Sequence, residues 1–144
     1  MYSKVLQDTL SFPGYWWDPN HARQYLARCS FLPKITGQAN VSANGVRYRA
    51  NLLRINASVF VGGPDDGVIG PWQSAHFGAV PPGSSNESDI VPMRAQPTYA
   101  SDAVGLRSLD EAGKVELYVR AGIKHSQWLT DATVFEEAIE PLLN

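Results

Sequence analysis

The sequence predicts an α/β fold, and three features carry this prediction. Two short segments rich in β-branched and aromatic residues, 57–62 and 115–119, have the length and composition of buried strands. A helical pattern over 102–112, with Asp102 near its N-cap, lies between them. A strand, a helix and a second strand in this order form a parallel crossover unit. The chain has 144 residues, which is one domain at most, with room for a modest core.

The part of the chain before the first strand is predicted to be mainly helical. Apolar residues recur on one helix face over 2–10, and a proline and a glycine then end that helix. Asn20 is expected to cap a short helix that runs through Cys29. Residues 33–44 are expected to form a polar loop, and residues 46–54 a further helix.

Loops and one more helix complete the predicted elements. Residues 63–67 have turn chemistry directly after the first strand, and the Pro-, Gly- and Ser-rich residues 79–89 form a loop. The last helix covers about 131–143, with an apolar stripe along one face. Thr133 and Glu136 are expected to form a capping box at its start.

Composition excludes several classes of function. The net charge is −2 and the basic residues are scattered, so no nucleic-acid partner is expected. No apolar run approaches the roughly 18 residues of a membrane span, so no stable membrane insertion is expected. The N-terminus lacks the layout of a signal peptide and resembles the inside of a helix, as if the chain were entered in mid-fold.

The cysteine and histidine content argues against disulfides and metals. Cys29 is the single cysteine, so no internal disulfide can form, and we expect a small residue that is buried or half-buried. The three histidines, His21, His76 and His125, do not pair at ligand spacing, so no metal site and no cofactor are expected. His21 and His76 are expected to be surface or capping residues.

Three N-x-[ST] sequons offer possible glycosylation sites at Asn40, Asn56 and Asn86. Three in so short a chain favour a secretory route. Such tripeptides also arise by chance, and the sequence leaves both explanations open.

Asp66 and His125 are the candidate catalytic residues. Catalytic groups in α/β sheets collect just past the carboxyl ends of strands, and each of these residues follows a predicted strand by a few positions. A carboxylate there can hold an imidazole in the tautomer that accepts a proton. The order acid before base is that of α/β-hydrolases. Spacing alone leaves the alternative that Asp66 is a turn former and His125 a solvated loop residue.

Several stretches resemble the lysosomal palmitoyl-protein thioesterases, in one collinear order over nearly the whole chain. They are Tyr-Ser-Lys-Val at 2–5, Tyr-Trp-Trp-Asp-Pro at 15–19, Phe-Leu at 31–32, His-Phe-Gly at 76–78, the run 99–113 and Pro-Leu-Leu at 141–143. The resemblance implies the C-terminal part of an α/β-hydrolase fold, comprising the end of a lid insertion, the last two parallel strands and their flanking helices. Residues 1–54 would end the helical lid that forms the acyl groove, and residues 55–144 would belong to the core.

The resemblance also implies an activity. The family removes long-chain fatty acyl groups from cysteine thioesters with a serine, an aspartate and a histidine. The acid falls on Asp66, with Asp65 as its rival, and the base falls on His125, with Trp128 shortly after it. Lys124 departs from the family pattern, which usually has an acidic residue just before the base. Implied partners are S-acylated proteins or fatty acyl thioesters, and the implied location is lysosomal or secreted.

No nucleophile motif G-x-S-x-G occurs in the chain. The nearest string, at 83–87, lacks the second glycine and follows the acid, so Ser85 is a poor replacement. The resemblance implies that the nucleophile lies in an N-terminal half that this sequence does not contain. Two readings follow: a thioester hydrolase of which this is the half with the acid and the base, inactive alone, or an inert remnant or docking subunit that needs a separate N-terminal chain.

Two further expectations concern packing. Tyr15, Trp16 and Trp17 are expected either to line the acyl groove or to form the lid core, and the sequence leaves both open. A sheet of only two parallel strands needs cover on both faces and both edges. The chain alone is therefore expected to be marginally stable, aggregation-prone or paired.

Overall fold

The computed structural model describes residues 1–38 and 43–143, and it contains helices and a two-stranded parallel sheet. Strand β1 is Ser58–Gly62 and strand β2 is Val115–Val119. They pair in parallel register, with Phe60 opposite Leu117. The predicted parallel strand pair is therefore confirmed, and the arrangement is of the α/β type.

The part before β1 is helical, as predicted, although the bounds of its helices differ from those predicted. The helices are α1 (Lys4–Thr9), α2 (Ala22–Arg28), α3 (Leu32–Ile35) and α4 (Ala43–Leu52), with 3-10 turns at Phe12–Tyr15 and Pro19–His21. Asn20 does not cap α2, so that prediction was wrong. The Asp18 side chain accepts a hydrogen bond from the Asn20 backbone N–H, because Pro19 starts a 3-10 turn one residue earlier.

The loop predicted over 33–44 is confirmed at 36–38 and was wrong at its two ends, which are helical. Helix α3 occupies its beginning, because Pro33 near the helix start has the backbone angle that a first turn requires. The Thr36 backbone N–H donates to the Leu32 carbonyl and closes this single turn. Helix α4 begins at Ala43, three residues before the predicted start of 46.

The connection from β1 to β2 consists of short elements. These are 3-10 turns at Trp72–His76, Glu87–Asp89 and Met93–Ala95, followed by α5 (Pro97–Ala100) and α6 (Leu106–Glu111). The predicted helix 102–112 begins too early, because Asp102 and Gly105 both have left-handed backbone angles, with φ of 51° and 90°. The predicted loop 79–89 contains the turn at Glu87–Asp89.

The C-terminal helix changes its winding along its length. It starts as α7 (Ala132–Val134), continues as a π-helix over Phe135–Ile139 and ends as a 3-10 turn over Glu140–Leu142. The predicted capping box was wrong, because the Asp131 side chain caps the helix and accepts from the Val134 backbone N–H at 3.0 Å. Pro141 lacks an N–H and disfavours regular α-winding in the turn before it.

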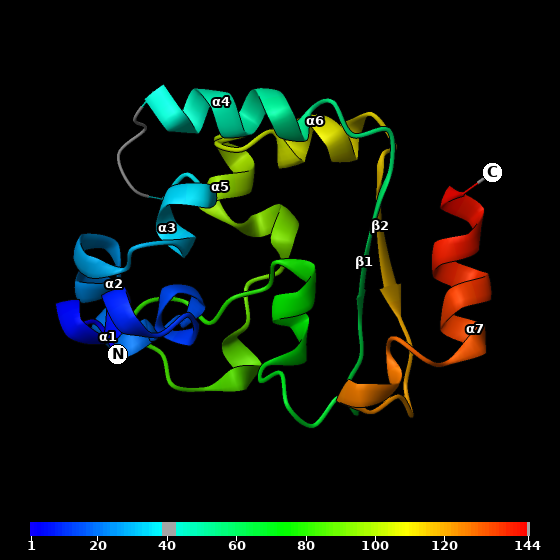
Figure 1. Cartoon of the computed structure of the whole chain (residues 1–144), viewed down its shortest axis with the longest axis horizontal. Helices are drawn as coiled ribbons and strands as arrows, with labels where there is room; N and C mark the ends of the chain where they lie inside the picture. The colour runs from blue at the N-terminus through cyan, green and yellow to red at the C-terminus, as the bar shows by residue number, and fades with distance from the viewer. Residues whose placement is uncertain (39–42, 144) are drawn as a thin grey trace.

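The elements form layers around the sheet (Figure 1). The C-terminal helix lies on one side of the two strands, and the connecting segments lie on the other. Buried side chains come from the C-terminal helix, from α6 and from the N-terminal part; they include Val134, Ala138, Leu106, Leu109, Tyr2, Tyr25 and Cys29. The predicted burial of Cys29 is confirmed.

The sheet itself is only partly covered. In β1 only Gly62 is buried, and no residue of β2 is. Val119 has 53% of its surface exposed. Of the helices in the described ranges, none has both the length and the apolar character needed to cross a bilayer.

Candidate active site

The loops that follow β1 and β2 meet at the carboxyl end of the sheet. Asp66 comes four residues after β1, and His125 begins a 3-10 turn, His125–Gln127, after β2. The His125 Nδ1 lies 3.1 Å from Asp66 Oδ1 and 3.0 Å from Oδ2. The His125 backbone N–H also donates to the Asp66 carbonyl at 2.9 Å. The predicted proximity of the two side chains is therefore observed, with two points of attachment between their loops.

The backbone after Asp66 folds around its carboxylate. The Val68 and Ile69 N–H groups donate to Oδ1 at 3.0 and 2.7 Å. Gly67, between Asp66 and Val68, has a φ of 79°, which glycine adopts readily. This is the local turn that an Asp-Gly pair favours. The turn function of Asp66 and its contact with His125 are thus compatible.

Trp128 is a contact of Asp66 that the sequence reasoning missed. Its indole Nε1–H donates to Asp66 Oδ2 at 2.7 Å. The spacing in the sequence could have indicated this contact, because residues three apart in a 3-10 turn project from the same side. Trp128 follows His125 by that spacing at the end of the turn.

Opposing effects act on the Asp66 carboxyl group, which is only 6% exposed. Burial raises its pKa, because it disfavours the charged form. The hydrogen bonds from Ile69, His125, Val68 and Trp128 together outweigh burial and hold the pKa of Asp66 well below its ordinary value. The carboxylate is therefore ionised at neutral and mildly acidic pH.

The His125 side chain is half-exposed, at 48%. Its Nδ1 faces the carboxylate, while its Nε2 has no hydrogen-bond partner among the residues that the structure describes. An imidazole held in this way carries its proton on Nδ1 and can accept another at Nε2. The arrangement can therefore support proton transfer to or from a group that approaches Nε2.

The rival carboxylate, Asp65, has a different partner. Its Oδ2 accepts from the Gly122 backbone N–H at 2.7 Å. This bond joins the loop after β1 to the loop after β2. Asp65 thus lies beside the candidate site and holds its loops together, whereas Asp66 contacts His125.

The other two histidines have separate environments. His76 is buried, and its Nε2 lies 3.1 Å from the Tyr118 carbonyl, so the expectation of a surface or capping residue was wrong. Its place in the turn against β1 explains the burial. His21 is exposed, as expected, with its Nδ1 2.7 Å from Asp18.

The aromatic residues 15–17 differ in burial. Trp17 packs edge-to-face on Tyr25, with ring centroids 4.8 Å apart, in the N-terminal core cluster. Tyr15 and Trp16 are exposed, at 58% and 49%. Ser85, the poor nucleophile candidate, accepts a hydrogen bond from Asn20.

Asn56 and Asn86 are exposed, so both sequons are accessible in this structure, whereas Asn40 lies outside the described residues. Within the described part of the chain, no group of three or more histidine, cysteine or acidic side chains is arranged to hold a metal ion.

Comparison with known proteins identifies the family. The model of the family described as palmitoyl protein thioesterase matches residues 1–125. The chain belongs to the palmitoyl protein thioesterase family. It is 39% identical over 143 residues to the lysosomal thioesterase PPT2 homolog of Drosophila melanogaster, covering 99% of this chain and 48% of that protein.

Other members of the palmitoyl protein thioesterase family show the same partial coverage. The chain is 40% identical to lysosomal thioesterase PPT2 of Homo sapiens over 134 residues, which are 93% of this chain and 43% of that protein. It is 36% identical to palmitoyl-protein thioesterase 3 of Dictyostelium discoideum over 117 residues, 81% of this chain and 39% of that protein. The chain spans about half, or less, of the length of the curated relatives it matches.

Proposed function

We propose that this chain is the C-terminal part of an α/β-hydrolase that cleaves long-chain fatty acyl cysteine thioesters, and that it supplies the acid and the base of the catalytic triad. The observation that carries the proposal is the His125 Nδ1 held 3.0 Å from the buried Asp66 carboxylate, with Nε2 unpaired among the residues that the structure describes. Membership of a thioesterase family supports the reaction class.

In the proposed reaction, a serine of the N-terminal half supplies the nucleophile. His125 Nε2 takes the serine proton while the serine oxygen attacks the thioester carbonyl carbon. The carbon–sulfur bond breaks, and the leaving cysteine thiolate takes the proton from Nε2. A water molecule then attacks the acyl ester with the same assistance, which releases the fatty acid and restores the serine. Asp66 orients His125 and stabilises the imidazolium that forms in both steps.

We assign residues 1–54 to the end of the lid and residues 55–144 to the hydrolase core. Of the three aromatic residues at 15–17, the exposed Tyr15 and Trp16 are the ones that remain available to an acyl chain. We propose a lysosomal location because the PPT2 relatives are named lysosomal thioesterases. S-acylated proteins or fatty acyl thioesters are the proposed substrates.

The test is a chimera in which this chain replaces the matching segment of the Drosophila melanogaster relative. The chimera is expected to hydrolyse a palmitoyl thioester, and His125→Ala is expected to reduce kcat/KM at least about 10³-fold, because the general base is removed. His21→Ala is the matched control, since His21 is exposed and paired with Asp18. A chimera with His125→Ala that retains near-original activity would refute the role of His125.

The second candidate is a docking subunit or inert remnant without catalysis of its own. One observation favours it: the two-stranded sheet of this chain is only partly covered. Assaying this chain alone, and then with the separately produced remaining half of the relative, distinguishes the candidates. Activity only in the mixture supports docking of a catalytic half. If this chain binds the remaining half of the relative but the mixture is inactive, and the chimera is inactive too, the results support an inert remnant.

A further inference from the structure

The Asp66 carboxylate is held on both of its oxygen atoms. Backbone N–H groups of Val68 and Ile69 occupy Oδ1, and both come from the loop of Asp66 itself. The indole N–H of Trp128 occupies Oδ2 from the other loop, at 2.7 Å. His125 Nδ1 then faces the edge between the two oxygens, at nearly equal distances of 3.1 and 3.0 Å.

The Trp128 ring is itself fixed in position. Trp128 is half-buried at the end of the turn that begins with His125. A Cβ atom built on Gly63 would lie 3.1 Å from the Trp128 Cη2 atom, so the ring packs against the backbone directly after β1. The same side chain therefore contacts the loop after β1 through its ring and through its N–H group.

We propose that Trp128 is a positioning residue, whose indole N–H fixes the rotation of the Asp66 carboxylate so that it holds the Nδ1–H tautomer of His125. That this position matters for catalysis rests on the proposed function. The effect of Trp128 on the geometry of Asp66 and His125 does not. With Oδ2 released, only Oδ1 stays anchored, and the carboxylate can turn away from the edge that faces Nδ1. A hydrogen bond to a charged group is among the stronger ones in proteins, so this loss is measurable.

The experiment is long-range ¹H–¹⁵N NMR of the His125 ring in this chain at a pH where the imidazole is neutral. The wild type is expected to show the Nδ1–H tautomer. Trp128→Phe keeps an aromatic ring and removes the N–H, and it is expected to increase the Nε2–H tautomer and to speed Nδ1–H exchange with water about tenfold. A His125 spectrum unchanged from wild type in this variant would overturn the proposal.

Trp17→Phe is the matched control. Trp17 Nε1 donates to the Val80 carbonyl at 2.9 Å, so this variant loses a bond of the same type elsewhere in the chain. It is expected to leave the His125 spectrum unchanged. If Trp128→Phe does not fold, the 3-benzothienyl analogue of tryptophan at position 128 replaces only the N–H by sulfur and keeps the ring shape. The same tautomer change is then expected.

Activity gives an independent readout in the chimera described above. Trp128→Phe is expected to lower kcat about tenfold with KM nearly unchanged, because the variant alters the base and not the acyl site. If the NMR signals of this chain are altered by Trp128→Phe but the chimera has no thioesterase activity, the proposed function is refuted and the positioning of His125 stands. Unaltered signals with lowered activity would refute the positioning role alone.

Discussion

Asp65 and Asp66 are adjacent and chemically identical, and the backbone decides which of them can orient His125. Asp66 is 6% exposed and its side chain faces Nδ1, whereas Asp65 accepts a backbone N–H from Gly122. The sequence places both in one turn and cannot separate them by spacing. Because their partners differ, changing each aspartate to asparagine tests which of the two orients His125.

In the chimera, Asp66→Asn is expected to reduce kcat/KM about 10³- to 10⁴-fold, because an amide can present its N–H₂ group to Nδ1 and favour the wrong tautomer. Asp65→Asn retains an oxygen for the Gly122 N–H and is expected to change kcat/KM less than about tenfold. Steady-state hydrolysis of a palmitoyl thioester measures both. Equal losses in the two variants would contradict the assignment of Asp66 as the acid.

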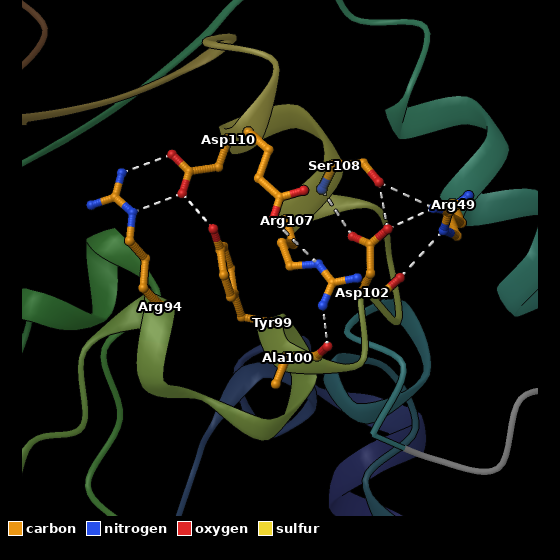
Figure 2. A network of polar contacts seen from close by, with 9 residues as sticks. Arg49, Arg94, Tyr99, Ala100, Asp102, Arg107, Ser108 and Asp110 are labelled. Carbon is orange, nitrogen blue, oxygen red and sulfur yellow. Dashed lines mark hydrogen bonds and ion pairs between the residues drawn. The ribbon is translucent and has the colours of Figure 1, made fainter.

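Asp102 is a second buried carboxylate, in a network with Arg49 and Ser108 (Figure 2). Arg49 pairs with Asp102 Oδ2 at 2.5 Å, and the Ser108 backbone N–H donates to Oδ1 at 3.1 Å. Burial raises the pKa of Asp102, but the hydrogen bonds from Ser108 and Arg49 outweigh it and lower the pKa to about 2. Gly105 is the N-cap of α6, but it has no side chain that can accept a hydrogen bond. The Asp102 carboxylate accepts instead from the N–H of Ser108, the third residue of the helix.

This lowered pKa predicts acid sensitivity of folding. The ordinary value is 3.8, so the unfolded chain binds the proton first as pH falls. The contribution of Asp102, about 2 kcal/mol, is complete above pH about 5 and is lost between about pH 4 and 2. Urea unfolding at a series of pH values measures it. Asp102→Asn and Arg49→Gln are both expected to flatten the dependence, and a slope unchanged in both variants would contradict the prediction.

At the scale of elements, the strand ends are brought together by a glycine. A Cβ atom on Gly63 would lie 2.0 Å from the Arg120 carbonyl oxygen and 3.1 Å from Trp128. The contact is with backbone, which cannot rotate aside as a side chain can. The absence of a side chain at this position lets the loops that carry Asp66 and His125 approach each other.

Gly63→Ala is therefore expected to destabilise the protein by at least about 3 kcal/mol. It is also expected to reduce thioesterase activity in the chimera, because the two loops must separate. Gly70→Ala is the matched control, since its nearest neighbour would be the Glu87 Oε1 at 4.0 Å. Urea unfolding compares the two variants, and equal stabilities would show that the close approach of the strand ends is not required.

At the scale of the whole molecule, the two parts divided at residue 54 are joined by specific contacts. The Arg49 side chain of α4 reaches Asp102 and Ser108 (Figure 2). Trp17 donates to the Val80 carbonyl, and the Gly83 backbone N–H donates to the Pro19 carbonyl. Both parts therefore contribute to one folded unit in this chain.

The incomplete cover of the sheet predicts how the chain behaves alone. All of β1 before Gly62 is only partly buried, and Val119 of β2 is exposed. Exposed strands of this kind pair with other chains. At concentrations of about 10 µM, analytical ultracentrifugation is expected to show self-association that decreases when the remaining half of a relative is added. A stable monomer under both conditions would contradict this prediction.

The sequence by itself determined the two strands, their parallel direction, the family, and the loops that carry Asp66 and His125. These depend on short-range composition, chain order and similarity along the whole chain. Tertiary structure decided that Asp66 and not Asp65 faces His125, that Trp128 joins them, and that His76 is buried. It also placed the start of the predicted helix 102–112 at Leu106. The physical reason is that these outcomes depend on contacts between distant residues, such as Trp128 with Asp66, which no local periodicity encodes.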